Sequence, residues 1–287
     1  MRIGAAAAPR WWGVDQLRLP AYLAHLSASG ASSVEFIVHH GPATRDPATV
    51  HLDRATWDFA VREATRRGLH VDIHNSLDPG FRLDRWTTDP DGLKTDLAPI
   101  LDLLASIEQQ QASPPVFVVH AAERCSEPEA VTREVLAWLA SELVVRRIQS
   151  VACVELRAGA GLDDERFDRD RNRLVTFVEK QRNPAIGVCW DVSNEWLSSV
   201  RIGRNLAMPD TMPSCVRHVH LHGATSDGLL HAPLGDGNVP WVAALDLVRS
   251  ARWAGSVTLE IRYRLAHDIG EPWTVLAESI SRALHVR

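Results

Sequence analysis

The sequence predicts a single α/β domain, a (β/α)8 or TIM barrel over residues 1–287, and three observations support this fold class. Apolar runs of strand length alternate with segments of helical period. The alternation repeats eight times without a strong break in composition. A length of 287 residues is large for one domain of most folds but normal for this barrel. Strict alternation indicates a parallel sheet, and eight repeats favour its closure.

The predicted strands are short apolar runs, rich in β-branched residues and bounded by turn residues, which is typical of buried parallel strands. They are Arg2–Ala7, Ser33–Val38, His70–His74, Val116–His120, Val151–Leu156, Ile186–Asp191, His218–Leu221 and Ser256–Ile261. A doubly wound open sheet is the alternative arrangement. No GxGxxG motif follows the first strand, so this alternative has no support from the motif that usually accompanies it.

The predicted helices lie between these strands and carry the expected terminal residues. They are Pro20–Ser29, Asp53–Arg67, Gly92–Gln109, Pro128–Arg147, Glu165–Lys180, Ser193–Val200, Trp241–Ala251 and Trp273–Val286. Gly30 and Gly68 follow helices where a left-handed residue commonly ends them. Asp53 and Ser193 are predicted N-caps, and Pro128 suits the first turn of its helix.

Composition and charge indicate a soluble, reduced globular protein. Hydrophobic residues make up 45% of the chain and charged residues 23%, which is typical of a protein with a large core. The net charge of −5 gives no electrostatic footprint for nucleic-acid binding. The four cysteines form no CxxC pair, and the first ten residues lack the long apolar stretch of a signal peptide. No segment approaches the length of a membrane span. We therefore expect a cytoplasmic protein without a nucleic-acid or membrane partner.

Five ionisable residues close successive predicted strands: His120, Glu155, Asp191, His220 and Glu260. Reactive groups gather at the carboxyl ends of barrel strands, so these side chains are expected to converge on one mouth. Clustered carboxylates repel one another and are costly to bury without compensation. Carboxylates with neutral imidazoles are what a divalent cation requires. A metal site is therefore the leading interpretation.

The alternative interpretation of this convergence is a buried ion-pair network. Arg157, two residues after Glu155, is the obvious cation for such a network. His74 and His120 have two interpretations of similar weight, as ligands of a second ion or as structural histidines. His218 and His222 are expected to support the ligands or to pack. Glu35 is a candidate substrate contact, but the face of its strand on which it lies is not settled.

Four motifs in order resemble the xylose isomerase-like barrel superfamily, which includes sugar isomerases, ketose 3-epimerases, inosose dehydratases and endonuclease IV. The most specific is His218-Val-His-Leu-His-Gly with the later His231-Ala-Pro-Leu-Gly-Asp-Gly. Gly187-Val-Cys-Trp-Asp191 resembles the aspartate motif of the sixth strand, and His74-Asn-Ser-Leu resembles the histidine of the third. The resemblance covers nearly the whole chain.

The resemblance implies one divalent ion, of Mn, Co, Mg, Zn or Fe, held by Glu155, Asp191, His220 and Glu260. A second ion, as in endonuclease IV, would use His74, His120 and Glu155. The positions of a third ion are occupied here by Asn194, Leu229 and His231. Two of these three residues differ from the expected ligands, and leucine cannot ligate, so one or two ions fit better than three.

The implied activity is that of a metal-dependent isomerase or epimerase, or a related dehydratase or lyase, acting next to a carbonyl of a sugar-like small molecule. Glu155 and Glu260 would move the proton. The alternative is a dinuclear enzyme with the same barrel, either an iron-dependent oxidase or oxygenase or a phosphoester hydrolase. Residues predicted to bind the substrate are Trp12, Arg157, Asn194 and His231. A homo-oligomer is compatible with the sequence.

Overall fold

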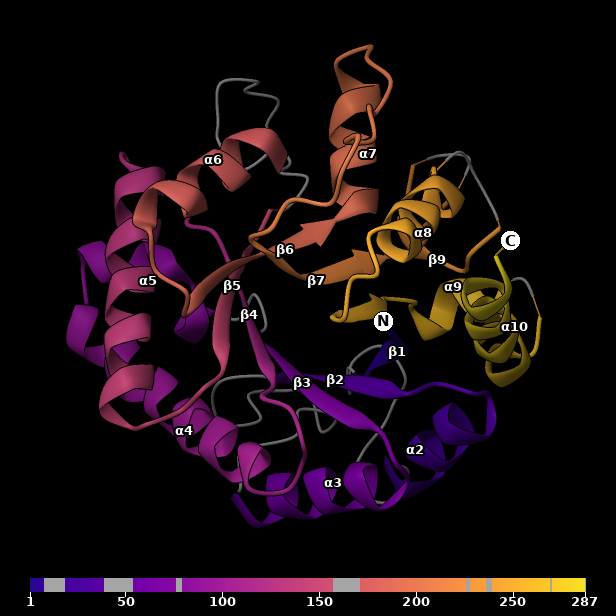
Figure 1. Ribbon diagram of the computed structural model, residues 1–287, viewed down its shortest axis with the longest axis horizontal. Helices are drawn as coiled ribbons and strands as arrows, with labels where there is room; N and C mark the ends of the chain where they lie inside the picture. The colour runs from indigo at the N-terminus through magenta and orange to yellow at the C-terminus, as the bar shows by residue number, and fades with distance from the viewer. Residues whose placement is uncertain are drawn as a thin grey trace.

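The computed structural model describes residues 1–7, 19–38, 54–75, 79–156, 171–225, 228–235, 239–268 and 270–286. Parallel strands close into a barrel in the order β1-β10-β7-β6-β5-β4-β3-β2, with helices around the outside (Figure 1). The strands of the barrel are β1 Arg2–Ala7, β2 Ser33–Val38, β3 His70–Asn75, β4 Val116–His120, β5 Val151–Glu155, β6 Ile186–Asp191, β7 Val216–Leu221 and β10 Ser256–Leu259. The predicted barrel is confirmed, and the doubly wound alternative is wrong.

Eight of the described helices correspond to predicted ones and differ from them at their ends, whereas α9 has no predicted counterpart. They are α2 Leu19–Ala28, α3 Arg54–Arg66, α4 Pro90–Glu108, α5 Pro128–Val145, α6 Arg171–Gln181, α7 Val192–Arg201, α8 Trp241–Ser250, α9 Tyr263–His267 and α10 Pro272–His285. None of these helices combines the length and the apolar character that crossing a bilayer would require.

Several short elements were not expected from the sequence. Two 3-10 helices, η1 Pro79–Phe81 and η2 Leu83–Thr87, precede α4. After β7, a two-stranded antiparallel sheet pairs β8 Gly223–Ala224 with β9 Leu230–Ala232. Such segments, like the five-residue α9, are too short to show a hydrophobic period, so periodicity alone does not find them.

Alternate strand residues face opposite sides of the barrel wall. One set packs beneath the helices in the main hydrophobic core, for example Phe36 of β2 and Trp190 of β6. The other set faces the interior, where a small apolar cluster of Val118, Cys153 and Cys189 lies among buried polar side chains. This polar interior leads directly to the carboxyl ends of the strands.

The helix ends confirm three predicted terminal residues and correct one. Gly30 and Gly68 have positive φ angles of 84° and 74° after α2 and α3, and Pro128 begins α5. Ser193 was predicted to cap α7, but the cap is Asp191, whose side chain accepts hydrogen bonds from the first turn. The prediction failed because β6 runs into α7 without a loop. Asp53 lies outside the described residues.

Candidate metal centre

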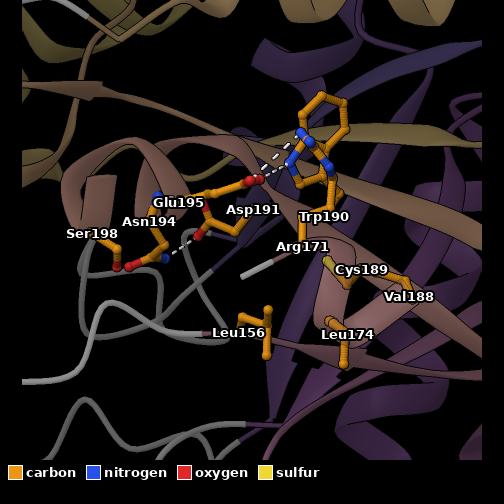
Figure 2. A pocket seen from close by; sticks show the side chains of 10 residues that line it. All are labelled: Leu156, Arg171, Leu174, Val188, Cys189, Trp190, Asp191, Asn194, Glu195 and Ser198. Carbon is orange, nitrogen blue, oxygen red and sulfur yellow. Dashed lines mark hydrogen bonds and ion pairs between the residues drawn. The ribbon is translucent and has the colours of Figure 1, made fainter. Parts of the chain in front are cut away.

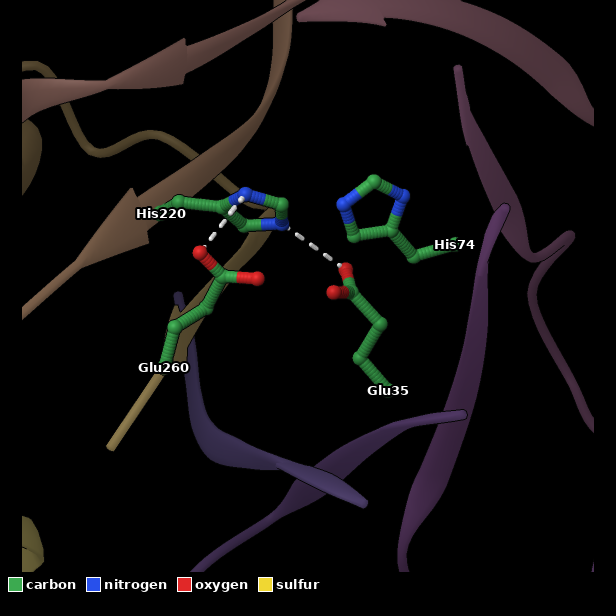
Figure 3. Close-up of side chains that lie close together, drawn as sticks. All are labelled: Glu35, His74, His220 and Glu260. Carbon is green, nitrogen blue, oxygen red and sulfur yellow. Dashed lines mark hydrogen bonds and ion pairs between the residues drawn. The ribbon is translucent and has the colours of Figure 1, made fainter. Parts of the chain in front are cut away.

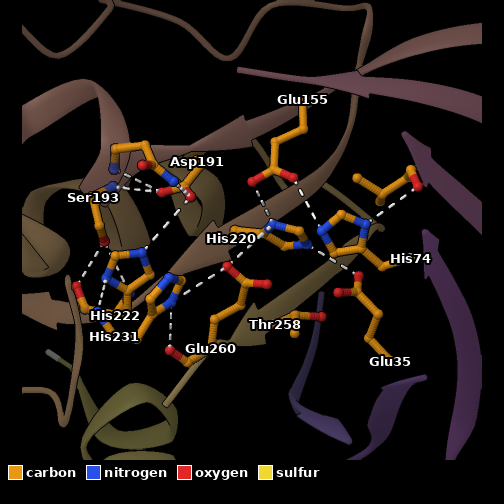
Figure 4. Close-up of polar contacts among 12 residues, drawn as sticks. Glu35, His74, Glu155, Asp191, Ser193, His220, His222, His231, Thr258 and Glu260 are labelled. Carbon is orange, nitrogen blue, oxygen red and sulfur yellow. Dashed lines mark hydrogen bonds and ion pairs between the residues drawn. The ribbon is translucent and has the colours of Figure 1, made fainter. Parts of the chain in front are cut away.

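The polar strand-end residues meet at the mouth of the barrel. Glu155 ends β5, Asp191 ends β6, and Glu260 directly follows β10. His220 lies one residue before the end of β7. In Figure 4 these four side chains point toward one another from their separate strands. The structure thus brings together the four residues that the sequence predicts as ligands of one ion.

We call Glu155, Asp191, His220 and Glu260 the ligand cluster. One potential ligand atom from each lies within 4.8 Å of the others, and all four residues are buried. His220 Nδ1 is 3.1 Å from Glu155 Oε1 and 3.6 Å from Glu260 Oε2. Three carboxylates and one imidazole at this spacing form a donor set suited to a divalent cation.

A second group shares Glu155 with the ligand cluster. His74 Nε2 is 3.1 Å and His120 Nε2 is 3.3 Å from Glu155 Oε2. The other ring nitrogen of His74, Nδ1, donates to the carbonyl oxygen of Val118 at 3.3 Å. This bond fixes the orientation of the ring, so that Nε2 would become available to a cation beside Glu155 once it loses its proton. The geometry is therefore compatible with a second ion at His74, His120 and Glu155.

Asp191 is held in place by the start of α7. Its Oδ1 accepts the backbone N–H groups of Ser193 and Asn194, both at 2.9 Å. Its Oδ2 accepts the side-chain amide of Asn194 and lies 3.7 Å from His222 Nε2. The predicted substrate-binding residue Asn194 therefore contacts a member of the ligand cluster.

His231 lies against the other side of the cluster, on β9. Its backbone N–H donates to His222 Nδ1 at 3.0 Å, and the two rings lie with their centroids 4.3 Å apart. Its Nδ1 donates to the backbone carbonyl of Glu260 at 3.1 Å. The small β8–β9 sheet therefore places His231, a predicted substrate contact, directly beside Glu260 (Figure 4).

A pocket next to Asp191 lies among β6, α6 and α7 (Figure 2). Asn194 and Ser198 line it together with the buried Arg171. The guanidinium of Arg171 stacks over Trp190 at 5.2 Å and lies 3.5 Å from Glu195 Oε1. Because Glu195 balances its charge, Arg171 is best interpreted as a structural tie between α6 and α7.

Two predicted substrate contacts, Trp12 and Arg157, lie outside the described residues. The alternative interpretation of the cluster is a buried ion-pair network around Arg157. Within the described residues, the ion-pair partners of Glu155, Asp191 and Glu260 are histidines.

A polar layer lies beneath the cluster and includes Glu35, the candidate substrate contact, and His218, which was expected to support a ligand or to pack. Glu35 of β2 is fully buried inside the barrel, where its Oε2 lies 3.1 Å from His220 Nε2 and 2.6 Å from His218 Nε2. A signal for its inward orientation was present in β2. Val34, Phe36 and Val38 pack in the main core under the helices, and this alternation leaves Glu35 on the inner face.

Burial and charge give the two glutamates of the cluster different proton affinities. Burial would raise the pKa of Glu155, but the facing His220 and His120 outweigh it and lower that pKa well below its usual value. The pKa of Glu260 is raised to about 7 by burial, to which the charge of Glu155 adds, despite the opposing effect of His220. In the metal-free protein near neutral pH, Glu155 is therefore ionised while Glu260 holds a proton for much of the time.

The histidines of the site also divide into two classes. Burial favours the neutral ring of His220, but the surrounding carboxylates of Glu35 and Glu260 outweigh it and raise its pKa well above the usual value. The pKa of His231 is lowered well below the usual value by burial and by the neighbouring His222. His231 is therefore a neutral ring beside Glu260.

Comparisons with known proteins agree with this architecture. The sequence pattern of one family, described as "Xylose isomerase-like TIM barrel", matches residues 23–282. No curated protein sequence matches the chain.

Solved structures with the same fold include several sugar epimerases. D-allulose 3-epimerase from Methylomonas sp. has a TM-score of 0.64 at 15% identity, covering 99% of this chain and 96% of its own. D-psicose 3-epimerase from Clostridium cellulolyticum H10, solved with D-tagatose, has a TM-score of 0.63 at 15% identity. The match covers 99% of this chain and 97% of the epimerase chain. The 3-keto-D-glucoside 4-epimerase from E. coli has a TM-score of 0.63 at 12% identity. The match covers 98% of this chain and 99% of the epimerase chain. At these identities the likeness establishes the fold.

Proposed function

The chain belongs to the xylose isomerase-like TIM barrel family, and on this premise we propose that it is a divalent-metal-dependent isomerase or epimerase. The proposed substrate is a sugar-like small molecule that loses and regains a proton next to a carbonyl. The observation that supports the proposal most strongly is the ligand cluster of Glu155, Asp191, His220 and Glu260. These residues are buried, and one potential ligand atom from each lies within 4.8 Å of the others. The family's sugar epimerases share this fold and support the same substrate class.

The residues present fit a divalent cation. Three carboxylates buried together need a compensating charge, because their repulsion and desolvation are costly. Among the described residues, Glu155 Oε2 and His222 Nε2 are buried atoms without a hydrogen bond of adequate geometry. An ion held by Glu155, Asp191, His220 and Glu260 would stabilise the negative charge that develops on the carbonyl oxygen during proton removal.

The two glutamates would move the proton. Glu155 is the ionised member of the pair and is assigned as the base. Glu260, whose pKa is raised to about 7, is assigned as the group that returns a proton. Two carboxylates with separated proton affinities are the usual basis for assigning acid and base roles. A bound cation would lower the pKa values of both carboxyl groups.

Neighbouring residues would orient the substrate. His231 lies beside Glu260, and its neutral ring is suited to a hydroxyl group. Asn194 contacts Asp191 and lines the adjacent pocket. Trp12 and Arg157 remain predicted substrate contacts, the first as an apolar wall and the second as a clamp for a negatively charged group.

The direct test is proton exchange in D2O. The metal-loaded protein is incubated with a panel of ketoses, including D-allulose and D-tagatose, and NMR follows deuterium entering the carbon next to the carbonyl. We expect exchange by the wild type and its loss in Glu155→Gln and Glu260→Gln. Asp72→Asn is the matched control, since Asp72 is an equally buried carboxylate in the barrel without contact to the ligand cluster. Full exchange in Glu155→Gln would remove the proposal.

A second candidate function is dinuclear chemistry. The observation that favours it is the group of His74, His120 and Glu155, whose ligand atoms also lie within 4.8 Å of one another. Such a pair of ions would suit phosphoester hydrolysis or iron-dependent oxidation. Elemental analysis of protein isolated without added metal separates the candidates. One ion per chain favours the isomerase or epimerase, and two ions that fall to one in His74→Ala favour the dinuclear enzyme.

A further inference from the structure

The ring of His220 is held between acceptors on both of its nitrogens. Nδ1 faces Glu155 Oε1 at 3.1 Å and Glu260 Oε2 at 3.6 Å. Nε2 faces Glu35 Oε2 at 3.1 Å. Figure 3 shows the ring of His220 between Glu260 on one side and Glu35 on the other. A neutral imidazole carries one proton, so only one of these nitrogens can present a lone pair to a cation.

Glu35 lies on the side of His220 away from Glu155. It comes from β2, which is not adjacent to β7 in the barrel, so its side chain reaches His220 across the interior. The residue is fully buried. A carboxylate in such a position is costly unless hydrogen bonds satisfy it.

The Glu35 carboxylate is itself fixed from a second direction. His218 Nε2 donates to Glu35 Oε2 at 2.6 Å, and Thr258 Oγ1 lies 3.0 Å from the same nitrogen. The rings of His218 and His220 meet edge to face, with centroids 5.0 Å apart. Two residues of β7 thus share one carboxylate oxygen, which limits the rotation of both rings.

We propose that Glu35 is a positioning residue that holds His220 as the Nε2–H tautomer, so that its Nδ1 lone pair is available to a divalent cation between Glu155 and Glu260. A carboxylate on the far nitrogen of a ligating imidazole orients the ring and raises its basicity. The inference rests on the metal centre of the proposed function and adds a residue outside the ligand cluster.

A competing arrangement would make Glu35 a ligand. One potential ligand atom each from Glu35, His74, His220 and Glu260 also lies within 4.8 Å of the others. In that arrangement His220 would bind through Nε2 and could not donate to Glu35. The geometry favours the positioning role, because Glu35 Oε2 lies within hydrogen-bond distance of His218 Nε2 and His220 Nε2 together.

The test measures Mn²⁺ affinity directly. Protein stripped with a chelator is titrated with Mn²⁺ at one pH, and free Mn²⁺ is followed by electron paramagnetic resonance. We expect Glu35→Gln to weaken binding by roughly 10- to 100-fold, the usual cost of removing such a partner. Asp72→Asn is the matched control. Asp72 is a buried carboxylate of the adjacent strand, paired in register with Glu35, and its shortest contacts are to Val116 N and His70 rather than to His220.

Each outcome of the titration decides the inference. Weaker binding in Glu35→Gln with unchanged binding in Asp72→Asn supports it. Equal affinity of Glu35→Gln and wild type, or equal weakening in both variants, overturns it and leaves the metal centre standing. Two Mn²⁺ ions in the wild type and one in Glu35→Gln would make Glu35 a ligand and also overturn it. A wild type that binds no divalent cation overturns the inference and the proposed function together.

The tautomer can be read in the wild type, so the inference remains testable if Glu35→Gln fails to fold. In ¹⁵N-histidine-labelled protein loaded with Zn²⁺, the ring signals of His220 are assigned through its backbone. The expected result is a proton on Nε2 and a metal-bound Nδ1. A proton on Nδ1 would contradict the inference.

Discussion

At the scale of single residues, the site depends on two glutamates that differ in environment rather than in chemistry. Glu155 faces His74, His120 and His220, whereas Glu260 has His220 and His231 at 3.6 and 3.8 Å. The closer histidines lower the pKa of Glu155 against the effect of burial. Burial and the charge of Glu155 raise the pKa of Glu260 to about 7. The same side chain can therefore serve as a base at one position and as a proton donor at the other.

Because of these proton affinities, metal binding should tighten as pH rises. Glu260 has a raised pKa of about 7, so below that pH it holds a proton that a cation must displace. His220, whose pKa is also raised, must likewise lose its Nδ1 proton. Each displaced proton changes affinity by about tenfold per pH unit. Between pH 6 and pH 7 we expect Mn²⁺ affinity to rise by about 10- to 100-fold.

Calorimetry in buffers of different ionisation enthalpy measures the number of protons released on Mn²⁺ binding. The expected number at pH 6 is between one and two, and it should fall by about one in Glu260→Gln, since the amide has no proton to lose. A proton count of zero at pH 6 would mean that neither Glu260 nor His220 is a ligand.

How much of the site could be predicted depended on where each residue stands in its strand. Glu155, Asp191, His220 and Glu260 end apolar runs, so the general rule for barrel strands located them. Glu35 stands in the middle of β2, where the alternation with Val34, Phe36 and Val38 places it on the inner face but does not indicate what it contacts. Its role comes from contacts with His218 and His220, which lie far from it along the chain. Long-range contacts of this kind have no local sequence signal.

At the scale of elements, strands and helices differ in how closely sequence defines their ends. The bounds of β1, β2, β4 and β6 agree with the predicted ranges. In β2, β4 and β6 this agreement arises because the apolar run stops at a polar residue. The start of α7 was misplaced, because a helix was expected to follow a loop and to carry its own cap. Asp191 instead serves as the last residue of β6 and as the cap of α7.

This double role of Asp191 predicts that two substitutions will separate metal binding from helix stability. Asparagine is as good an N-cap as aspartate, whereas alanine cannot cap. We expect Asp191→Asn to lose Mn²⁺ affinity while the metal-free protein keeps its stability. Asp191→Ala should lose the same affinity and also about 1 kcal/mol of unfolding free energy. Urea unfolding of the metal-free variants measures the difference. Equal stability of the two variants would argue against the capping role.

At the scale of the whole molecule, the ligand cluster links strands that are distant along the chain. Its members come from the ends of β5, β6, β7 and β10, which are consecutive in the barrel wall. A cation bound only by the folded protein stabilises it by mass action, by about 2.7 kcal/mol at one hundred times the dissociation constant. Without the cation, the charge of Glu260 opposes folding, because burial and the neighbouring charge of Glu155 raise its pKa.

The metal-free barrel should therefore gain stability when Glu260 loses its charge, in a way that depends on pH. The folded-state pKa of Glu260 is raised from 4.5 to about 7, so its ionisation opposes folding. Its ionisation lowers the free energy of unfolding. This effect is absent below pH 4.5, grows between pH 4.5 and pH 7, and is complete above pH 7. One pKa unit corresponds to about 1.4 kcal/mol, so the full effect is on the order of 3 kcal/mol.

We expect metal-free Glu260→Gln to match the wild type at pH 4.5 and to exceed it by up to about 3 kcal/mol at pH 8. Urea unfolding in the presence of a chelator measures this difference. Saturating Mn²⁺ at pH 8 should reverse the order, because only the wild type retains all four ligands. If the metal-free wild type were the more stable protein at pH 8, Glu260 would have a stabilising partner already. The cluster would then be an ion-pair network rather than a metal centre.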